Sequence, residues 1–414
     1  MISCSTIRRP SAVAAVLLLA LTGCTSVAPP PNDAASPSPT VSAASGPTTI
    51  HPGWVAFATD HAASDITLVR SGEPAHRAFG SDNDGILAIC PAFSPDGERL
   101  AFGETQGDGA LVIADVNAER AASVIAKVDL DLPHAPCPIW SPDGQWVAFG
   151  AGETGVGPHR RVDAVWLVDA ETGEIRSVLE PYVTDIEWAP DGAQLYIASN
   201  AGIRVYSLSD ARLRTLEGTE RARNITVSPN GDALVVERRP LNAAERHDLV
   251  LMNADGSDQR VLVNDYAHFH SIGPVFSPDG GHVVFVRTCD TFTDAEGNEI
   301  PCTEQQDVIL VTVDERDPTV PIGTQRVLPL LQTGSGDDAW TWFPYVVTWA
   351  PDSAALLYLA WGESQVAVAG GEYVEGLVAV PVDGTAPEVL YESSTWIDVY
   401  AGFPRNNFQS WSVK

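Results

Sequence analysis

The sequence predicts an all-β protein built as a closed ring of seven four-stranded sheets. Three observations predict this fold: a turn motif recurs along the chain, an apolar strand-like segment follows each copy, and the two ends of the repeat region look like complementary halves of one sheet. The intervals between successive copies are 47, 48, 39, 49, 73 and 62 residues. A repeat of roughly 40–50 residues is typical of the blades of a β-propeller.

Each copy of the motif has an aromatic or β-branched residue, then Ser or Ala, Pro, Asp or Asn, and usually Gly. The copies lie at residues 93–97, 140–144, 188–192, 227–231, 276–280 and 349–353, with a truncated seventh copy at 411–413. Proline presets the backbone at the second turn position, Asp or Asn favours the third, and Gly accepts a positive φ at the fourth. Each copy is therefore predicted to join two antiparallel strands.

The two ends of the repeat region predict how the ring closes. Residues 54–57 look like the second strand of a blade that has no first strand before it, and residues 408–413 look like a first strand with no second strand after it. Pairing them in one blade gives seven blades and covers the lone edge at each end. The alternative is a ring of six blades with loose termini.

The N-terminal residues predict export and lipid anchoring. Arg8 and Arg9 precede an apolar run at residues 12–21, which is too short to span a bilayer and suits a signal peptide. The run ends in a small residue and Cys24, which resembles the bacterial lipobox, whose cysteine is lipidated. The predicted organisation is a signal peptide at 1–23, a lipidated cysteine and Pro/Ser/Ala-rich tether at 24–49, and the propeller at 50–414. The alternative is a secretory signal with a chance cysteine.

The repeat of W/F-S-P-D-G with a trailing apolar strand resembles the TolB-type, WD-repeat-like propeller over nearly all of residues 50–414. Proteins of that family often have six blades and a separate N-terminal domain, whereas this chain has the tether in that place. The resemblance implies a propeller fold and, as one option, a role in envelope assembly.

The net charge of the chain limits the kinds of partner that it can bind. The sequence has 54 Asp and Glu against 24 Lys and Arg, a formal net charge of −30. An acidic surface repels phosphate backbones, so we expect no nucleic-acid partner. The acidity is also explained by solubility outside the cell, and a docking face for a partner is the alternative.

Four cysteines of the predicted propeller suggest disulfide bonds, because an even number outside the cytosol favours them. Cys90 and Cys137 each stand four residues before the motif serine, where neighbouring innermost strands begin, so a bond between two blades is predicted. Cys289 and Cys302 flank a polar insertion and are predicted to close a hairpin loop at its base. The alternative is a metal or redox pair.

Three histidines are candidate ligand-binding residues at the mouth of the channel. His268 and His270 are two residues apart, so in an extended segment both point to one face, an arrangement that suits a divalent metal. His134 lies in a matching loop of another blade. The alternative is loop histidines that only form hydrogen bonds. Some related seven-bladed lyases acting on pectic sugars hold a metal with channel-mouth histidines, a resemblance at the level of the fold alone.

A second candidate binding set precedes the last complete motif. It contains Asp337, Asp338, Trp340, Trp342 and Tyr345, in a segment predicted to be a loop before a first strand. Aromatic rings beside carboxylates can bind sugars or peptides. The alternative is that these rings pack between blades.

These features favour an extracytoplasmic, membrane-anchored lipoprotein that acts as a binding or scaffolding module for a protein, peptide or glycan. The alternative function is a metal-dependent carbohydrate lyase or hydrolase with its site at the channel mouth, carried by His268 and His270. No catalytic residues and no cofactor are predicted for the binding module. The sequence contains no G-x-S-x-G elbow, P-loop or H-E-x-x-H motif.

Overall fold

The computed structural model of the chain falls into two compact units, Met1–Pro47 and Thr48–Lys414. Within the second unit the structure describes residues 54–59, 65–70, 72–79, 88–104, 109–116, 122–129, 137–151, 162–199, 201–239, 247–264, 273–287, 292–293, 299–300, 307–314, 320–328, 331–333, 340–364, 373–393 and 410–411. The predicted signal peptide at 1–23 and tether at 24–49 lie outside these residues, and both stay predictions.

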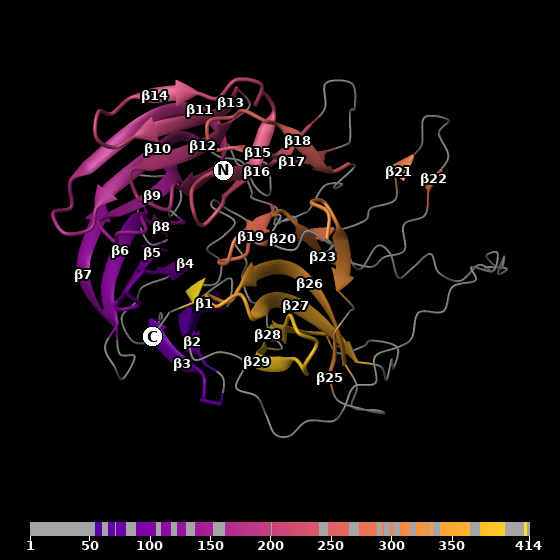
Figure 1. Cartoon of the computed structure of the whole chain (residues 1–414). Coiled ribbons are helices and arrows are strands. Elements are labelled where there is room, and N and C mark those ends of the chain that lie inside the picture. The colour runs from indigo at the N-terminus through magenta and orange to yellow at the C-terminus, as the bar shows by residue number, and fades with distance from the viewer. Residues whose placement is uncertain are drawn as a thin grey trace, which may run out of the picture. The chain divides into compact units, whose positions relative to one another are not determined.

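Every element of the described residues is a β-strand, and no helix long and apolar enough to cross a membrane occurs among them. The strands form seven blades arranged as a β-propeller, which confirms the predicted fold and excludes the six-bladed alternative (Figure 1). The blades follow one another in chain order, and each is numbered here from the N-terminus.

The strands of the first two blades and of blades 5 to 7 form separate sheets. Blade 1 contains β1 (Val55–Thr59), β2 (Asp65–Val69), β3 (His76–Phe79) and β30 (Ser410–Trp411), and blade 2 contains β4 (Ala88–Phe93), β5 (Arg99–Glu104), β6 (Ala110–Val116) and β7 (Ala122–Asp129). Blade 5 contains β15 (Ala222–Val227), β16 (Ala233–Arg238), β17 (Asp248–Asn253) and β18 (Arg260–Val263). Blade 6 contains β19 (Val275–Phe276), β20 (His282–Arg287), β23 (Asp307–Thr312) and β24 (Gln325–Leu328). Blade 7 contains β26 (Trp340–Trp349), β27 (Ala355–Ser364), β28 (Tyr373–Pro381) and β29 (Glu388–Ser393), with an extra strand β25 (Leu331–Thr333) on the free edge of β26.

Blades 3 and 4 share one seven-stranded sheet. Its strands are β8 (Ile139–Trp140), β9 (Trp146–Ala151), β10 (Val162–Asp169), β11 (Ile175–Trp188), β12 (Gln194–Ser199), β13 (Gly202–Ser207) and β14 (Leu213–Thr215). The 14-residue β11 pairs with β10 as the outermost strand of blade 3 and then with β12 as the innermost strand of blade 4. The two pairings meet at Val183, where the register shifts. One strand therefore continues from one blade into the next without a loop.

The ring closes in blade 1, as the sequence predicts. β30, near the C-terminus, pairs antiparallel with β1, with Val55 opposite Trp411 and Ala56 opposite Ser410. β30 is the innermost strand of this blade, and β1, β2 and β3 follow outward from it. The closure covers the edge that β1 would otherwise expose.

The recurring motif forms the turn between the first and second strands of each blade, and its hydrogen bonds explain its residues. In blade 2 the Gly97 N–H donates to the Ser94 carbonyl (2.8 Å), and Gly97 has φ 70°. The Ser94 hydroxyl donates to Asp96 Oδ1 (2.5 Å) and accepts from the Arg99 N–H (2.9 Å). Asp96 Oδ1 also accepts from the Glu98 N–H (3.0 Å). The same bonds recur in other blades, so the motif is a self-contained turn. We call the side of the propeller that carries these turns the turn face.

The aromatic residue of the motif joins neighbouring blades. Where it is tryptophan, its indole N–H donates to a main-chain carbonyl in the innermost strand of the preceding blade. These bonds run from Trp140 to Ala92 (3.0 Å), from Trp188 to Ile139 (3.5 Å) and from Trp349 to Val275 (3.1 Å). Phe276 has no side-chain N–H, and at its junction the backbone N–H of Phe276 donates to Thr226 Oγ1 (3.2 Å).

The core lies between the blades. One position in the second strand, eight residues after the motif Ser or Ala, carries a fully buried ring in four blades. These residues are Phe102, Phe149, Phe285 and Tyr358. The faces of adjacent blades that carry them form continuous apolar clusters, such as the cluster between blades 6 and 7. Burial of this surface stabilises the ring because each blade covers the apolar face of the next.

Candidate functional site

Most of the residues predicted to bind ligand at the channel mouth lie outside the described residues. These are His134, His268, His270, Asp337 and Asp338. Their role, and the metal site proposed for the two neighbouring histidines, stays a prediction. In the part of the chain that the structure describes, no group of three or more His, Cys, Asp or Glu side chains is placed to hold a metal ion.

The aromatic residues predicted to lie in a loop before blade 7 belong to a strand, and that prediction is wrong. β26 begins at Trp340, because the residues that follow pair with both β25 and β27. Trp342 is fully buried and lies against Gly376, where a Cβ would stand 2.5 Å from the indole Cζ3. The ring of Trp342 therefore packs inside the fold, which was the alternative interpretation. Trp340 is half-buried, and Tyr345 lies at a register shift in the strand. For these two residues ligand binding stays a prediction.

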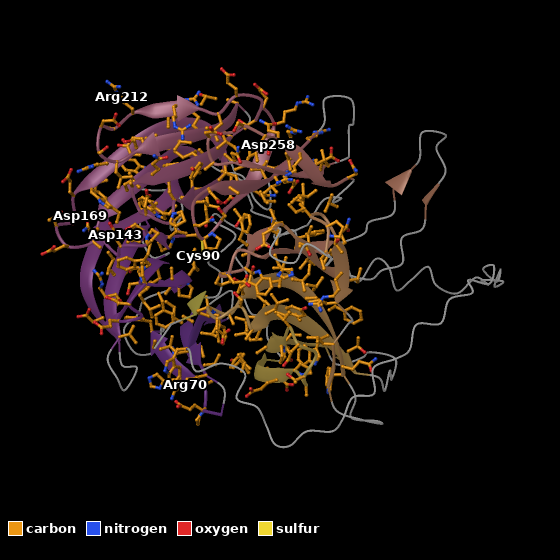
Figure 2. The ribbon with its side chains drawn as sticks, in the orientation of Figure 1. Arg70, Cys90, Asp143, Asp169, Arg212 and Asp258 are labelled. Carbon is orange, nitrogen blue, oxygen red and sulfur yellow. A yellow bond between two sulfur atoms is a disulfide. The ribbon has the colours of Figure 1, made fainter. Side chains whose placement is uncertain are left out.

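The disulfide predicted between blades is present. Cys90 and Cys137 are bonded, with their Cα atoms 5.0 Å apart, and both side chains are buried. Cys90 lies on the inner side of the ring, whereas Asp169 and Arg212 lie on its outer side (Figure 2). Cys289 and Cys302 lie outside the described residues, and the hairpin of β21 (Phe292–Thr293) and β22 (Glu299–Ile300) falls between them.

The position four residues before the motif Ser or Ala makes contacts between blades elsewhere in the ring as well. In blade 4 it is Asp185, whose Oδ2 accepts a hydrogen bond from the Ile225 N–H of blade 5 (2.8 Å). In blade 5 it is Asn224, which has φ 53°. In blade 6 it is Gly273, where a Cβ would stand 2.7 Å from the Asn224 Cβ. The pair of cysteines was the only part of this pattern that sequence reasoning found.

A buried polar cluster surrounds Glu237 where the first strand of blade 5 begins. Glu237 is fully buried, and its Oε1 lies 2.7 Å from Arg223 Nε and 2.5 Å from His247 Nδ1. Its Oε2 accepts from the Asn224 amide. His247 Nδ1 also lies 2.7 Å from Arg223 Nη2, so this nitrogen either donates to Glu237 or accepts from Arg223. The cluster links β15, β16 and the residue that precedes β17, and the buried Glu237 carboxylate is paired within it. A carboxylate ending the apolar run 234–236 was the sequence signal for it.

Two clefts open between blades on the turn face. The cleft between blades 5 and 6, the 5/6 cleft, has a volume of about 550 Å³, and the cleft between blades 6 and 7, the 6/7 cleft, has about 560 Å³. Both volumes fall within the roughly 300–1,000 Å³ of small-ligand sites. Neither cleft was predicted from the sequence, because the residues that line them come from separate repeats.

The two clefts are built from equivalent positions of the repeat. Arg260 pairs with Leu251 in blade 5 as Arg326 pairs with Leu310 in blade 6. The equivalent pairs, with the 5/6 residue first, are Leu251 and Leu310, Asn253 and Thr312, Asp258 and Thr324, Arg260 and Arg326, Val313 and Val382, and Asp314 and Asp383. The clefts thus share an apolar floor and an arginine on the outermost strand of the leading blade.

The 5/6 cleft is acidic. Its lining includes the four carboxylates of Asp232, Asp258, Asp279 and Asp314 around the single cation of Arg260. Two of these carboxylates also serve the turn motif: Asp232 accepts from the Ser228 hydroxyl (3.0 Å), and Asp279 accepts from the Gly281 N–H (3.0 Å). The acidic character of this cleft is therefore partly a consequence of the turn chemistry.

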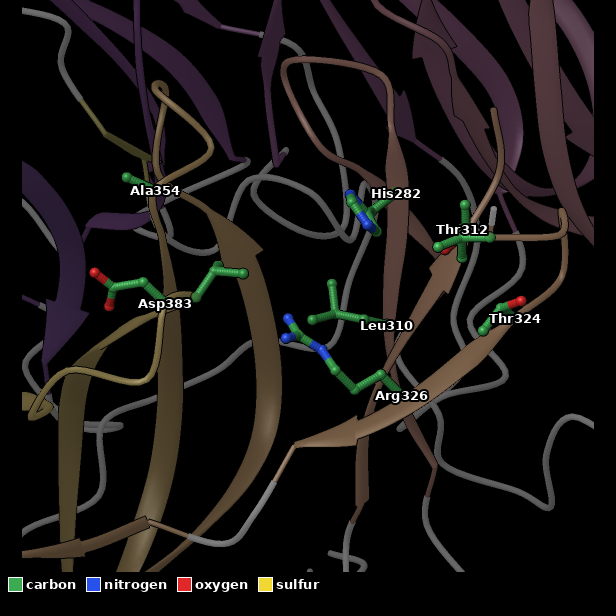
Figure 3. Close-up of a pocket in the computed structure, with 9 residues that line it drawn as sticks. His282, Leu310, Thr312, Thr324, Arg326, Ala354 and Asp383 are labelled. Carbon is green, nitrogen blue, oxygen red and sulfur yellow. The ribbon is translucent and has the colours of Figure 1, made fainter. Parts of the chain in front are cut away.

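The 6/7 cleft is mostly apolar, and its charged groups are arranged differently (Figure 3). The Arg326 guanidinium lies beside Leu310, and the carboxylate of Asp383 points away from it (Figure 3). Hydrogen bonds from the backbone N–H and the hydroxyl of Thr385, at 2.9 and 2.8 Å, hold Asp383. Among the described residues Arg326 has no ion pair. The guanidinium is exposed at the rim of the cleft.

The same bonds set the ionisation of Asp383. The Thr385 backbone N–H, and then its hydroxyl, hold the pKa of this exposed carboxyl below its usual value of 3.8. Because the folded pKa is lowered, the contribution of these bonds to stability is present above pH 3.8 and is lost as the pH falls through the lowered pKa. At neutral pH Asp383 is therefore an ionised group, and its carboxylate points away from Arg326 (Figure 3).

Comparison with protein families gives one match. The model of the TolB β-propeller domain matches residues 80–300, which is more than half of the chain. The chain belongs to the TolB β-propeller family. Comparison of this TolB-family chain with the curated proteins gives no match.

Solved structures are similar to the TolB-family chain at the level of the fold. TolB from Acinetobacter baumannii is 17% identical with a TM-score of 0.43, and the match covers 64% of this chain and 62% of that protein. A protein from Bacteroides uniformis described as a 6-phosphogluconolactonase is 13% identical with a TM-score of 0.52, and the match covers 87% of this chain and 99% of that protein. The chain thus spans less than two thirds of the Acinetobacter TolB. At such low identities the fold is the shared property.

Proposed function

We propose that this chain is a membrane-anchored extracytoplasmic propeller that binds a protein or peptide partner on its turn face. The observation that carries the proposal is the pair of clefts on that face. They have the volume of binding sites and lie on a ring whose blades are joined by hydrogen bonds and a disulfide. A binding surface built on such a scaffold loses little conformational entropy when a partner binds.

Lipid anchoring is the second part of the proposal. It is supported by the apolar run at 12–21 that ends before Cys24, and by the Pro/Ser/Ala-rich segment up to residue 49. Several acyl chains on a cysteine anchor a protein stably, because each buried CH₂ contributes roughly 0.8 kcal/mol. The segment up to residue 49 then acts as a flexible tether.

Fractionation tests the anchoring. The full chain, expressed with its natural N-terminus, is expected in the membrane fraction, and the Cys24→Ser variant is expected in the soluble extracytoplasmic fraction. A lipid-sized mass increase on the N-terminal peptide of the wild type supports the proposal. If the variant stays in the membrane and the wild type has no such mass, the anchoring proposal is wrong.

Photo-crosslinking on cells tests the binding face. A photoreactive residue in place of Thr324, in the 6/7 cleft, is expected to give a discrete adduct with a protein. The matched position is Ala201, which is exposed in the turn between β12 and β13, at the end of blade 4 opposite to the turn face. An adduct from Ala201 with equal yield, or no adduct from Thr324, would contradict a partner on the turn face.

A further inference from the structure

The 6/7 cleft combines an apolar floor with one guanidinium. Leu310, Val320 and Val382 line it. The Arg326 guanidinium lies beside Leu310 (Figure 3). A cleft with mostly apolar walls and a few placed polar groups is the usual form of a small-ligand site. The floor fits one or two apolar groups, and the guanidinium fits an anion.

Fewer carboxylates line this cleft than line the 5/6 cleft. Thr324 stands in the position of Asp258, so the residue two positions before the arginine is neutral here. The one carboxyl that remains, Asp383, is bonded to Thr385 and points away from Arg326 in Figure 3. In a protein with a formal net charge of −30, an arginine left without a carboxylate partner among the described residues selects a single anionic group at close range.

The hydroxyls of Thr312 and Thr324 also line the cleft and can accept hydrogen bonds. The Thr324 hydroxyl donates to the Pro321 carbonyl at 2.7 Å, so its oxygen can still accept a hydrogen bond. Thr312 is half-buried at the end of β23 and also lines the cleft. Hydroxyl acceptors in the same cleft as a guanidinium suit a ligand that carries both an anionic group and N–H donors.

We propose that the 6/7 cleft binds the C-terminal residue of a partner polypeptide whose last side chain is apolar. The α-carboxylate pairs with Arg326, the last side chain packs on Leu310 beside that guanidinium, and a peptide N–H of the segment that precedes it donates to a threonine hydroxyl. The C-terminus of a polypeptide carries all three groups, whereas an apolar acid without a peptide bond lacks the N–H. This inference rests on the proposed binding function and names the chemistry of the partner at that site.

Saturation-transfer NMR with short peptides on the full chain in detergent tests the proposal. The probes are three hexapeptides, Gly-Ser-Gly-Ser-Gly followed by Leu, Val or Phe, each as a free acid and as a C-terminal amide. At least one free acid is expected to bind ten or more times more tightly than its amide. Arg326→Gln is expected to remove this preference, and Arg260→Gln, at the equivalent position of the 5/6 cleft, is expected to preserve it.

Three results would overturn the inference. These are binding of acid and amide with equal affinity, binding that survives in Arg326→Gln, and no binding of any acid. Octanoate serves as the comparison without a peptide bond, and a fatty acid that binds more tightly than every peptide would also overturn it. All four leave the crosslinking result intact, so failure here is distinguishable from failure of the proposed binding function.

Discussion

The clefts on either side of blade 6 occupy the same place in the repeat and carry opposite chemistry. Both have an apolar floor and an arginine on the outermost strand, but four carboxylates line the 5/6 cleft with Arg260, whereas a single carboxylate, that of Asp383, lines the 6/7 cleft with Arg326. The positions that differ, such as Asp258 and Thr324, lie outside the turn motif. The turn motif therefore determines the shared fold of the blades, and residues outside the motif determine which ligands each cleft can bind.

The hydrogen bonds that join blade 5 to blade 6 and blade 6 to blade 7 also differ. We expect their removal to lower the free energy of unfolding more than the other substitutions. Trp349→Phe removes the indole N–H that donates to the Val275 carbonyl at 3.1 Å. We expect the free energy of unfolding in urea to fall by about 1.5 kcal/mol more than in Trp146→Phe, because a hydrogen bond between blades is lost. Trp146 is a matched control because it is buried to a similar extent, 8% against 6% exposed, and its indole has no hydrogen bond to a described residue. Equal losses in the two variants would show that the bond contributes nothing beyond packing.

The 5/6 junction depends on a hydroxyl, so an isosteric change tests it. Thr226→Val keeps the shape but removes the oxygen that accepts the Phe276 N–H at 3.2 Å. We expect a loss of about 1.5 kcal/mol in the free energy of unfolding, because the N–H is then buried without a partner. Thr215→Val, at an exposed position of β14, serves as the control and is expected to change stability by less than about 0.5 kcal/mol. A Thr226→Val variant as stable as the control would mean that another group replaces the hydroxyl.

Exchanging one residue between the clefts is expected to convert one into the other. Thr324→Asp places a carboxylate two residues before Arg326, as Asp258 stands two residues before Arg260 in the other cleft. Binding of the free-acid peptides should weaken about fivefold, because the new carboxylate competes for the guanidinium. Thr324→Asn controls for shape and should weaken binding less, as measured by the same NMR titration. Equal effects of Asp and Asn would show that charge is not what separates the clefts.

The smallest change in the free energy of unfolding is expected for a substitution of Tyr358, inside blade 7. Tyr358 occupies the position that Phe102, Phe149 and Phe285 hold in other blades, and its hydroxyl is buried without a hydrogen-bond partner among the described residues. Burial raises the pKa of this phenol above its usual range, so it stays neutral. Tyr358→Phe should therefore change the free energy of unfolding by less than about 0.5 kcal/mol or stabilise the protein. A loss above about 1 kcal/mol in thermal or urea unfolding would indicate a partner for the hydroxyl.

The fold was predictable from the sequence because each turn is a local structure. Ser94, Asp96 and Gly97 form hydrogen bonds with one another and with the next two residues. The motif can therefore be recognised in the sequence without knowledge of distant contacts. The closure and the disulfide between Cys90 and Cys137 followed because equivalent positions of a repeat lie near one another in space.

The candidate site was not predictable in the same way. The 6/7 cleft brings together Leu310, Arg326 and Val382 from two blades, and each of these residues alone looks like an ordinary strand residue. The polar cluster at Glu237 was missed for a related reason, since Arg223 and His247 reach it from different strands. The loop predicted at residues 337–345 was wrong in its second half because pairing with β25 and β27 extends β26 to Trp340.

The pairing of Val55 with Trp411 also sets the order in which the protein can be completed during synthesis. The edge of β1 is made first, and the strand that covers it is translated only after the six other blades, so the nascent chain carries an open sheet edge while those blades are made. An exposed edge can pair with a neighbouring chain before its own partner is available. Completion of the ring therefore follows the synthesis of every other blade, and a nonsense codon between β29 and β30 would remove the closing strand while leaving the six other blades translated.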